Sequence, residues 1–268
     1  MKVPFVKLHG AGNDFLLTET ALAPAQNLES IAIAICDRHT GVGGDGWMLI
    51  DSAANPETGF DAAIRLFNSD GSEPELSGNG TRCAAAYLAR QRPLQRAFRI
   101  RTGAGVKHLE LMTGGFPHYE FEMNMGDISV TELRAVVHGR DAVILDCGNP
   151  QCALPVQDFD FDWRALGKLI EWDARFPKRT NVSFLRTVDR HTIEVRFWER
   201  GAGETNSSGT GSTGAAMAAI ARGVADSPVT ILTPAGPLLL RVENGVYLTG
   251  PAEFIAEGSY FYGKISAE

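Results

Sequence analysis

Short segments in which apolar and polar residues alternate recur along almost the whole chain. They predict β-strands over residues 5–8, 15–18, 47–51, 63–68, 98–102, 119–125, 142–146, 192–198, 229–232, 238–242 and 246–249. Helical patterns are fewer, and they predict helices over residues 28–36, 80–90, 163–171 and 211–222. The pattern therefore predicts an α+β protein with a high sheet content.

Two of the predicted helices, 80–90 and 211–222, are rich in alanine and apolar on nearly all faces. In a water-soluble protein, a helix of this kind is enclosed by other elements. We therefore expect each of the two to lie at the centre of its own sheet, which gives an α+β unit made twice.

The same loop leads into both of these helices. Ser77-Gly78-Asn79-Gly80 precedes the first helix, and Ser208-Gly209-Thr210-Gly211 precedes the second. Two further pairs occur in the same order: Arg65-Leu66-Phe67-Asn68 with Arg196-Phe197-Trp198-Glu199, and Gly12-Asn13-Asp14 with Gly148-Asn149-Pro150. The offsets are nearly constant and too long for a solenoid, so they predict an internal duplication. The expected halves are residues 1–126 with 254–268, and residues 127–253.

The length and net charge of the chain exclude some classes of function. A chain of 268 residues with 44% apolar content is sufficient for two modest cores. The net charge of -7 provides no basic surface, so nucleic acid is not an expected partner. No apolar run approaches the roughly 20 residues that span a bilayer, and the amino terminus has no signal-like apolar core. We expect a soluble, cytoplasmic protein without a membrane partner.

The cysteines and histidines show no metal-binding spacing. There are four cysteines, none in Cys-x-x-Cys spacing, and the six histidines form no His-Glu-x-x-His motif. In a chain of this length the pattern is typical of reduced thiols, and we expect neither a metal site nor a disulfide framework.

The two helix starts are candidate anion sites. The first turn of a helix has unpaired N–H groups and a partial positive charge, and flanking glycines let its backbone approach a ligand closely. If the halves face one another, Ser77 and Ser208 would meet one small anionic ligand from two sides. Asn68 and Asn149 lie within the repeat, which favours ligand binding over turn capping, whereas Asn181 has no such support from the pattern alone.

A series of polar, Gly-rich motifs runs along the chain. The segments are Lys7-Leu8-His9-Gly10-Ala11-Gly12-Asn13-Asp14-Phe15, Asp37-Arg38-His39-Thr40-Gly41-Val42-Gly43-Gly44-Asp45-Gly46, Phe67-Asn68-Ser69-Asp70-Gly71-Ser72-Glu73, Gly78-Asn79-Gly80-Thr81-Arg82-Cys83, Gly148-Asn149-Pro150, Arg179-Thr180-Asn181-Val182, Glu199-Arg200-Gly201-Ala202-Gly203-Glu204-Thr205, Gly209-Thr210-Gly211 and Thr249-Gly250-Pro251-Ala252. In this order the chain resembles the diaminopimelate epimerases, enzymes of lysine and peptidoglycan precursor synthesis. The combination is specific and covers almost the whole chain.

The resemblance implies a fold and a reaction. The implied fold is α+β, with two pseudo-symmetric domains from an internal duplication, each a curved, antiparallel-rich sheet around a central buried helix. The implied protein is a homodimer that interconverts LL- and meso-diaminopimelate by two-base α-proton transfer, without pyridoxal phosphate or another cofactor. The residues that match substrate-holding positions are Asn13, Asn68, Asn149, Asn181, Glu199 and Arg200, with a carboxylate cradle of backbone N–H groups near Gly78, Asn79, Gly209 and Thr210.

The chain departs from the family at the catalytic positions. Ser77 and Ser208 stand where the family has its two catalytic cysteines, and Gln151 stands where many members have histidine. A free cysteine has a pKa of about 8.5, whereas a serine hydroxyl is a far weaker acid that needs a strong partner base. Glu199 is the nearest candidate partner for Ser208, and no comparable partner is evident for Ser77.

Three interpretations follow from this departure. The two serines could be engineered replacements in a substrate-trapping variant, although Gln151 and the surrounding serines favour natural divergence. The protein could be an isomerase that uses serine, either as an epimerase or as a proline-racemase-type or phenazine-biosynthesis-type isomerase or dehydratase. It could also be a non-catalytic amino-acid-binding paralogue. We predict a diaminopimelate-epimerase-type protein whose turnover is impaired.

Overall fold

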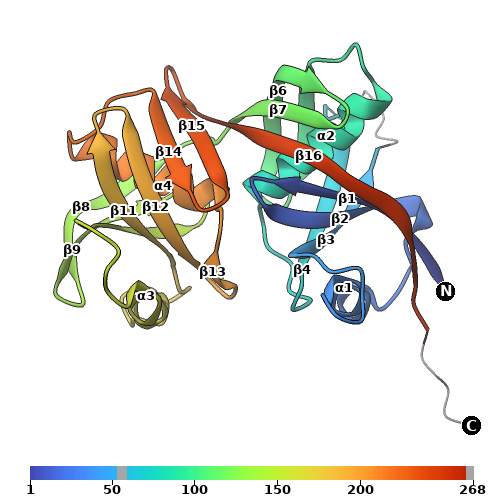
Figure 1. Ribbon diagram of the computed structural model, residues 1–268, viewed down its shortest axis with the longest axis horizontal. Helices are drawn as coiled ribbons and strands as arrows, with labels where there is room; N and C mark the ends of the chain where they lie inside the picture. The colour runs from blue at the N-terminus through green and yellow to red at the C-terminus, as the bar shows by residue number, and fades with distance from the viewer. Residues whose placement is uncertain (53–58, 264–268) are drawn as a thin grey trace, which may run out of the picture. The chain divides into compact units, whose positions relative to one another are not determined.

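The computed structural model describes residues 1–52 and 59–263, and they form two compact units (Figure 1). Unit 1 comprises residues 1–121 and the segment from residue 251 onward, and unit 2 comprises residues 122–250. The boundaries expected from the sequence, after residues 126 and 253, lie a few residues beyond these. Each observed boundary falls within a continuous strand, β7 (His118–Asn124) or β16 (Val246–Phe261). No loop or change in residue composition therefore marks the boundary in the sequence.

Unit 1 contains a sheet that closes on itself. Its remaining elements are β1 (Lys2–Gly10), β2 (Asn13–Glu19), η1 (Thr20–Leu22), α1 (Leu28–Cys36), β3 (Gly46–Asp51), β4 (Ala62–Asn68), α2 (Gly78–Gln91), β5 (Ala97–Thr102) and β6 (Gly105–Gly115). The strand order is β1-β2-β3-β4-β5-β6-β7-β16, and β16 pairs again with β1. Closure leaves no unpaired sheet edge along this path.

Helix α2 lies inside this sheet and α1 lies outside it. Strand β3 shows the two sides, because neighbouring residues of a strand point in opposite directions. Met48 reaches the start of α2, where its Cε would be 2.9 Å from a Cβ at Gly80. Trp47 and Leu49 instead belong to an apolar cluster with Ile31 of α1. The strand is therefore buried on both faces, and its middle positions are apolar throughout.

Unit 2 repeats this arrangement. Its elements are β8 (Ser129–Val137), β9 (Arg140–Asp146), β10 (Pro150–Pro155), α3 (Trp163–Glu171), β11 (Asn181–Asp189), β12 (Thr192–Glu199), β13 (Gly203–Thr205), α4 (Gly209–Ala221), β14 (Val229–Thr233), β15 (Gly236–Val242) and the first residues of β16. The strand order is β16-β15-β14-β12-β11-β10-β9-β8, with β13 on β12. Helix α4 contacts β8 through β12 as well as β14 and β15.

The duplication is visible in the strand directions. In unit 1, the strands on either side of α1 (β2 and β3) and of α2 (β4 and β5) pair in parallel. In unit 2, the strands on either side of α3 (β10 and β11) and of α4 (β12 and β14) do the same. Hairpin neighbours such as β5–β6 and β14–β15 are antiparallel. The predicted fold, α+β with two related halves around buried central helices, is confirmed.

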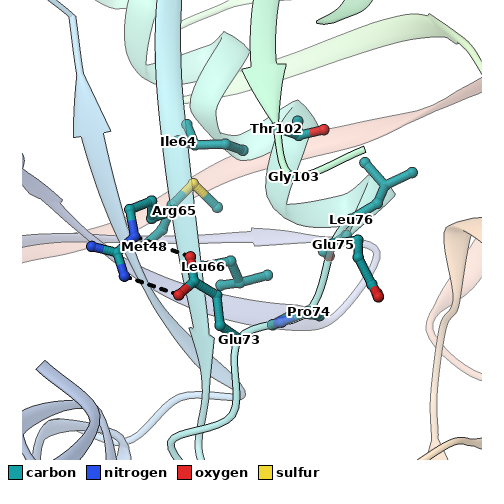
Figure 2. A pocket seen from close by; sticks show the side chains of 11 residues that line it. Met48, Ile64, Arg65, Leu66, Glu73, Pro74, Glu75, Leu76, Thr102 and Gly103 are labelled. Atoms are coloured by element: carbon teal, nitrogen blue, oxygen red, sulfur yellow. Dashed lines mark hydrogen bonds and ion pairs between the residues drawn. The ribbon is translucent and has the colours of Figure 1, made fainter. Parts of the chain in front are cut away.

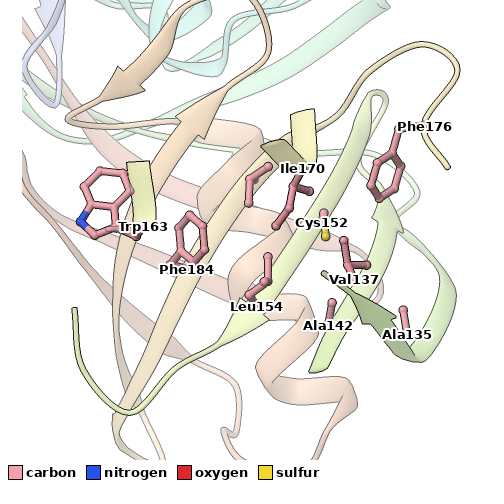
Figure 3. Packing of buried hydrophobic residues seen from close by; sticks show 10 residues of the cluster. Ala135, Val137, Ala142, Cys152, Leu154, Trp163, Ile170, Phe176 and Phe184 are labelled. Carbon is pink, nitrogen blue, oxygen red and sulfur yellow. The ribbon is translucent and has the colours of Figure 1, made fainter. Parts of the chain in front are cut away.

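The outer helix of unit 2 packs on its own apolar cluster. Trp163 and Ile170 of α3 lie with Leu154, Phe184 and Cys152 of the sheet, and Figure 3 shows these side chains together. The ring centroids of Trp163 and Phe184 are 5.9 Å apart. This cluster fixes α3 against β10 and β11. Among the described residues, no helix is long and apolar enough to cross a membrane.

Candidate active site

The two helix starts have the same local geometry. Ser77 and Ser208 are extended residues that cap α2 and α4, and each hydroxyl oxygen accepts a hydrogen bond, 3.1 Å long, from the third N–H of its helix. That third residue is glycine in both helices. A Cβ at Gly211 would lie 2.9 Å from Ser208 Oγ, and one at Gly80 would lie 3.3 Å from Ser77 Oγ. The repeated Ser-Gly-x-Gly pattern therefore makes room for the serine hydroxyl.

Ser208 is joined to a carboxylate. Its hydroxyl donates to Oε2 of Glu199 over 2.8 Å, and Thr205 donates to Oε1 of the same carboxylate over 2.6 Å. Glu199 ends β12, and Thr205 lies on β13, which pairs beside it. The carboxylate is thus held by two hydroxyl donors, and it can take the proton of Ser208.

Ser77 has different surroundings. Among the described residues, the hydrogen bond from Gly80 N–H is its hydroxyl's only side-chain interaction, and no carboxylate or imidazole is bound to it. The residue borders a cavity of about 230 Å³ with apolar walls from Met48, Ile64, Leu66 and Leu76. Figure 2 shows these side chains, with the ion pair of Arg65 and Glu73 (2.9 Å) to one side. The two equivalent serines therefore differ chemically.

A directed chain of hydrogen bonds holds Asn13 and Asn79 in unit 1. Arg82 donates to Asn79 Oδ1 over 2.5 Å, Asn79 Nδ2 donates to Asn13 Oδ1 over 3.3 Å, and Asn13 Nδ2 donates to Asp45 Oδ2 over 2.6 Å. A guanidinium can only donate and a carboxylate can only accept. The two charged ends therefore fix which way both amide groups point.

Arg82 is a buried cation. It is fully enclosed and also donates to the carbonyl oxygen of Pro251 over 3.2 Å, whereas its Nη1 has no hydrogen-bond partner among the described residues. Burial lowers the pKa of its guanidinium to about 10. No carboxylate lies within ion-pair distance of it in the described part of the chain. Its positive charge adds to that of the α2 helix start.

A charge network fixes the loop that carries Asp45. Asp14 accepts from Arg38 at 2.7 and 3.3 Å and from Lys7 at 3.0 Å, and Arg38 also contacts Asp45 at 2.8 Å. Burial raises the pKa of the Asp14 carboxyl, but the hydrogen bonds from Arg38 and Lys7 outweigh it, so the pKa lies below its ordinary value. Asp14 is therefore ionised at neutral pH, and it binds both Arg38 of this loop and Lys7 of β1.

Asn149 and Thr210 are connected in unit 2. Asn149 Nδ2 lies 3.2 Å from Thr210 Oγ1, and Gln151 Nε2 donates to Asn149 Oδ1 over 2.6 Å. Gln151 is buried, and its Oε1 has no hydrogen-bond partner among the described residues. Gln151 therefore orients Asn149 toward the first turn of α4.

Asn181 connects two other segments of unit 2. Its Nδ2 donates to the carbonyl oxygen of Pro150 over 3.0 Å, and its Oδ1 accepts from the backbone N–H of Arg200 over 3.0 Å. The Arg200 side chain donates to the carbonyl oxygen of Lys178 over 3.2 Å. Asn181 therefore does more than cap a turn, because it holds the start of β10 next to the Glu199-Arg200 turn.

Hydrogen bonds and shared helix starts connect most of the predicted residues within each unit, and Asn68 is the exception. In unit 1, Asn13 and Asn79 are joined directly, and Ser77 and Gly78 start the same helix as Asn79. Asn68 lies apart from this pair, in a turn where its Nδ2 donates to Ser72 Oγ over 2.9 Å. In unit 2, the set comprises Ser208, Gly209, Thr210, Asn149, Asn181, Glu199 and Arg200. Their contact with a substrate stays a prediction.

Four residues of these networks were not predicted from the sequence as site residues: Asp45, Arg82, Thr205 and Glu171. Asp45, Arg82 and Thr205 lie within the quoted motifs, so the motifs themselves were the available signal. Glu171 closes a predicted helix and carried no signal of its own. Its partners come from segments later in the chain.

None of the four cysteines is available as an acid or a base at neutral pH. All four are buried and free, and burial raises the pKa of each thiol to about 12. A thiol of this kind is protonated and unreactive at neutral pH. This includes Cys83, which lies on α2 within two turns of Ser77.

The chain is similar in sequence to known diaminopimelate epimerases. The family model described as diaminopimelate epimerase matches residues 5–131 and 143–255. The chain is 37% identical to a diaminopimelate epimerase of Pseudomonas fluorescens (strain Pf0-1) and 36% identical to one of Pelotomaculum thermopropionicum, with 96% of this chain and 99% of each relative covered.

Solved structures with low sequence identity share the fold. A hydroxyproline epimerase from Agrobacterium vitis matches with a TM-score of 0.75 at 13% identity, covering 96% of this chain and 92% of that one. A PhzF-family phenazine biosynthesis protein of Bacillus anthracis matches with a TM-score of 0.73 at 13% identity, covering 98% and 100%. From its motifs, its duplicated fold and these matches, the chain belongs to the diaminopimelate epimerase family.

Proposed function

We propose that this protein binds an amino acid of the diaminopimelate class and slowly interconverts its LL and meso forms by moving the α-proton. Membership of the family supports the substrate class. The observation that carries the proposal is the 2.8 Å hydrogen bond from Ser208 to Glu199, because it gives one serine a base. Neither step calls for pyridoxal phosphate, since the proposed acid and base are side chains.

The proposed chemistry begins at Ser208. The α-proton of the substrate passes to Ser208 Oγ while the hydroxyl proton of Ser208 passes to Glu199 Oε2, and the electron pair of the broken C–H bond stays on the α-carbon. The N–H groups at the start of α4 bind the substrate carboxylate and stabilise the negative charge. Ser77 is the second proposed acid: it donates its hydroxyl proton to the α-carbon and is re-protonated by water, while Glu199 returns its proton to water, so the number of protons is unchanged.

The difference between the serines makes a measurable prediction. Ser208 has a carboxylate that accepts its proton, and Ser77 has none among the described residues. Proton exchange on the Ser208 face is therefore expected to be faster than transfer across both faces. In D₂O, deuterium should enter the α-carbon with retained configuration sooner than the second diastereomer forms.

The test follows each diaminopimelate diastereomer in D₂O by mass spectrometry and chiral chromatography, with binding measured by calorimetry. Replacement E199Q should abolish exchange and leave folding intact. Lack of binding to either diastereomer would reject the substrate class. Binding without any deuterium incorporation would reject the isomerase.

A second candidate function is supported by Ser77, whose hydroxyl has no partner base among residues 1–52 and 59–263. A hydroxyl without a partner base is a poor acid and a poor base, which favours a non-catalytic amino-acid-binding protein. A proline-racemase-type or phenazine-biosynthesis-type reaction is a further alternative, since the fold is shared with such proteins. Calorimetry with proline and hydroxyproline beside diaminopimelate separates these possibilities.

We also propose that the protein is a cytoplasmic homodimer. The resemblance to family members supports the dimer. Light scattering during size-exclusion chromatography measures the mass directly, and a mass near the 28.9 kDa of one chain would reject it.

A further inference from the structure

Glu171 is a buried carboxylate with three donors. It ends α3, and only 4% of its surface is exposed. Oε2 accepts from Trp198 Nε1 over 2.8 Å, and Oε1 accepts from Gly201 N–H over 2.9 Å and Arg179 Nη1 over 3.1 Å. A buried carboxylate is stable only when hydrogen bonds of this kind replace its hydration.

Two of these donors flank the Glu199-Arg200 turn. Trp198 precedes Glu199, and Gly201 follows Arg200 with a φ of 80°. A hydrogen bond over 3.1 Å from Ala202 N–H to the Glu199 carbonyl oxygen closes the turn. Glu171 therefore holds the turn at both ends and sets the direction in which Glu199 faces Ser208.

The third donor connects a second segment to the same carboxylate. Arg179 has a φ of 56°, and its guanidinium lies 4.7 Å from the ring centre of Trp172 while it reaches Glu171. Two residues later, Asn181 accepts the N–H of Arg200. Residues 179–181 and 198–201 both carry predicted substrate positions, and Glu171 joins them.

The packing of α3 does not depend on this carboxylate. Trp163 and Ile170 already fix the helix through the apolar cluster of unit 2. Gly167 also lies so close to Trp198 that a Cβ there would be 2.7 Å from Trp198 Cβ. Apolar packing therefore already holds α3 in place, and the Glu171 carboxylate adds directional hydrogen bonds to the Glu199-Arg200 turn.

We propose that Glu171 is a positioning residue that holds Glu199 and Arg200 in the orientation required to bind and deprotonate the substrate. This inference rests on the proposed function for its consequence in binding. The geometry itself can be tested without a ligand. Glu171 acts through the turn and is not a catalytic residue.

The test uses E171Q, which keeps the side-chain shape but turns one acceptor oxygen into a donor. The new NH₂ group must then face either Trp198 Nε1–H or the two donors Gly201 N–H and Arg179. Two donors that face one another form no hydrogen bond, so the turn loosens. Hydrogen exchange at Gly201 N–H, followed by NMR, should accelerate about tenfold or more. Affinity for meso-diaminopimelate should fall about tenfold in calorimetry, and the α-proton exchange rate of bound substrate should fall as well.

The matched control is E204Q. Glu204 on β13 binds Arg164 of the same helix at 2.5 and 2.7 Å, so E204Q also removes a carboxylate contact to α3. It leaves the Glu199-Arg200 turn in place, and Gly201 exchange and affinity should stay within about twofold of the unaltered protein. W198F removes one donor but keeps a ring, and its effect should lie between the two.

Unchanged Gly201 exchange in folded E171Q would overturn the inference whether or not the protein binds diaminopimelate. Faster exchange with unaltered affinity would also overturn it, because the turn would then not serve the ligand. Equal effects of E171Q and E204Q would overturn it too, because Glu171 would then only help to hold α3 against the sheet. If E171Q fails to fold, W198F decides by the same two measurements. If the unaltered protein binds no diaminopimelate, the proposed function fails, and Gly201 exchange still tests the positioning.

Discussion

The hydroxyl of Ser208 donates a 2.8 Å hydrogen bond to Glu199, whereas its duplicate Ser77 has no carboxylate partner in the described part of the chain. The backbone geometry of the two serines is nearly the same, with φ of -137° and -125°. The duplication therefore preserved the helix start in both units but gave only one of them a base.

Replacing both serines by cysteine should raise the rate of α-proton transfer. A thiol at a helix start forms a usable thiolate population near neutral pH, whereas a serine hydroxyl does not. For S77C/S208C we expect α-proton exchange to rise by about 100-fold or more, the range of positioned acid–base groups. Single S208C should exchange deuterium but form little of the second diastereomer.

A suitable control is S129C, which places a thiol on the exposed start of β8. Its exchange rate should match that of the unaltered protein. Persistent inactivity of S77C/S208C with intact binding would instead indicate an altered pocket, in which Gln151 would be the first residue to examine.

Asp45 is expected to control ligand binding through the direction of the Asn13 and Asn79 amides. In D45N the side chain that accepts the hydrogen bond from Asn13 can donate one instead. The Asn13 amide group can then turn over and exchange its oxygen and nitrogen positions. We expect affinity for meso-diaminopimelate to fall by about tenfold, which corresponds to about 1.4 kcal/mol. Calorimetry measures the affinity, and thermal unfolding checks that the loop remains folded.

The control for D45N is R38Q. It removes the ion pairs of Arg38 with Asp45 and with Asp14 but leaves the Asp45 carboxylate beside Asn13. If R38Q weakens binding as much as D45N does, the ion pairs of Arg38 rather than the amide direction are responsible.

The buried cysteines make stability sensitive to alkaline pH. Burial raises each thiol pKa from 9.0 to about 12, so the folded protein retains protons that the unfolded chain releases. The cysteines' contribution to the free energy of unfolding is therefore fully present below about pH 9 and is lost as the pH rises toward about 12. A chromogenic thiol reagent at pH 8 should leave the folded protein unmodified and react with all four cysteines in urea. Rapid modification of the folded protein would contradict this burial.

Gly41 should tolerate no side chain. A Cβ there would lie 2.3 Å from the carbonyl oxygen of Ala34 and 2.6 Å from that of Ile35, both backbone atoms of α1. We expect G41A to lower the free energy of unfolding by about 3 kcal/mol or more, because the loop carrying Asp45 must shift. G115A is the control, since, apart from its two chain neighbours, no described residue has an atom within 4 Å of a Cβ at Gly115. Chemical denaturation of both variants measures the difference.

The sequence pattern predicted the helices better than the strands. The α1 and α3 ranges agree with the structure, and α2 and α4 begin two residues before their predicted starts, at the serine caps. Strands β6, β8, β10, β11 and β13 were missed. Most of β8 is exposed on both faces and most of β10 is buried on both, so neither alternates in the way that marks a half-buried strand.

The site was predictable where its residues lie in contiguous motifs. Glu199 was identified as the candidate partner of Ser208, and the structure places the two within hydrogen-bond distance. Thr205 and Glu171, which orient the same turn, were not identified. Their role arises from contacts between separate elements, and no periodicity along a single element records such contacts.

The path of β16 sets an order for folding during synthesis. The residues of unit 2 are contiguous, so all of its partners are present once residue 250 has been made. Strand β1 in unit 1 is made first, but it pairs with residues 253–261 of β16. Unit 2 can therefore form from one contiguous segment, whereas the sheet of unit 1 cannot close until residues 253–261 are available, and β1 keeps one exposed edge until then.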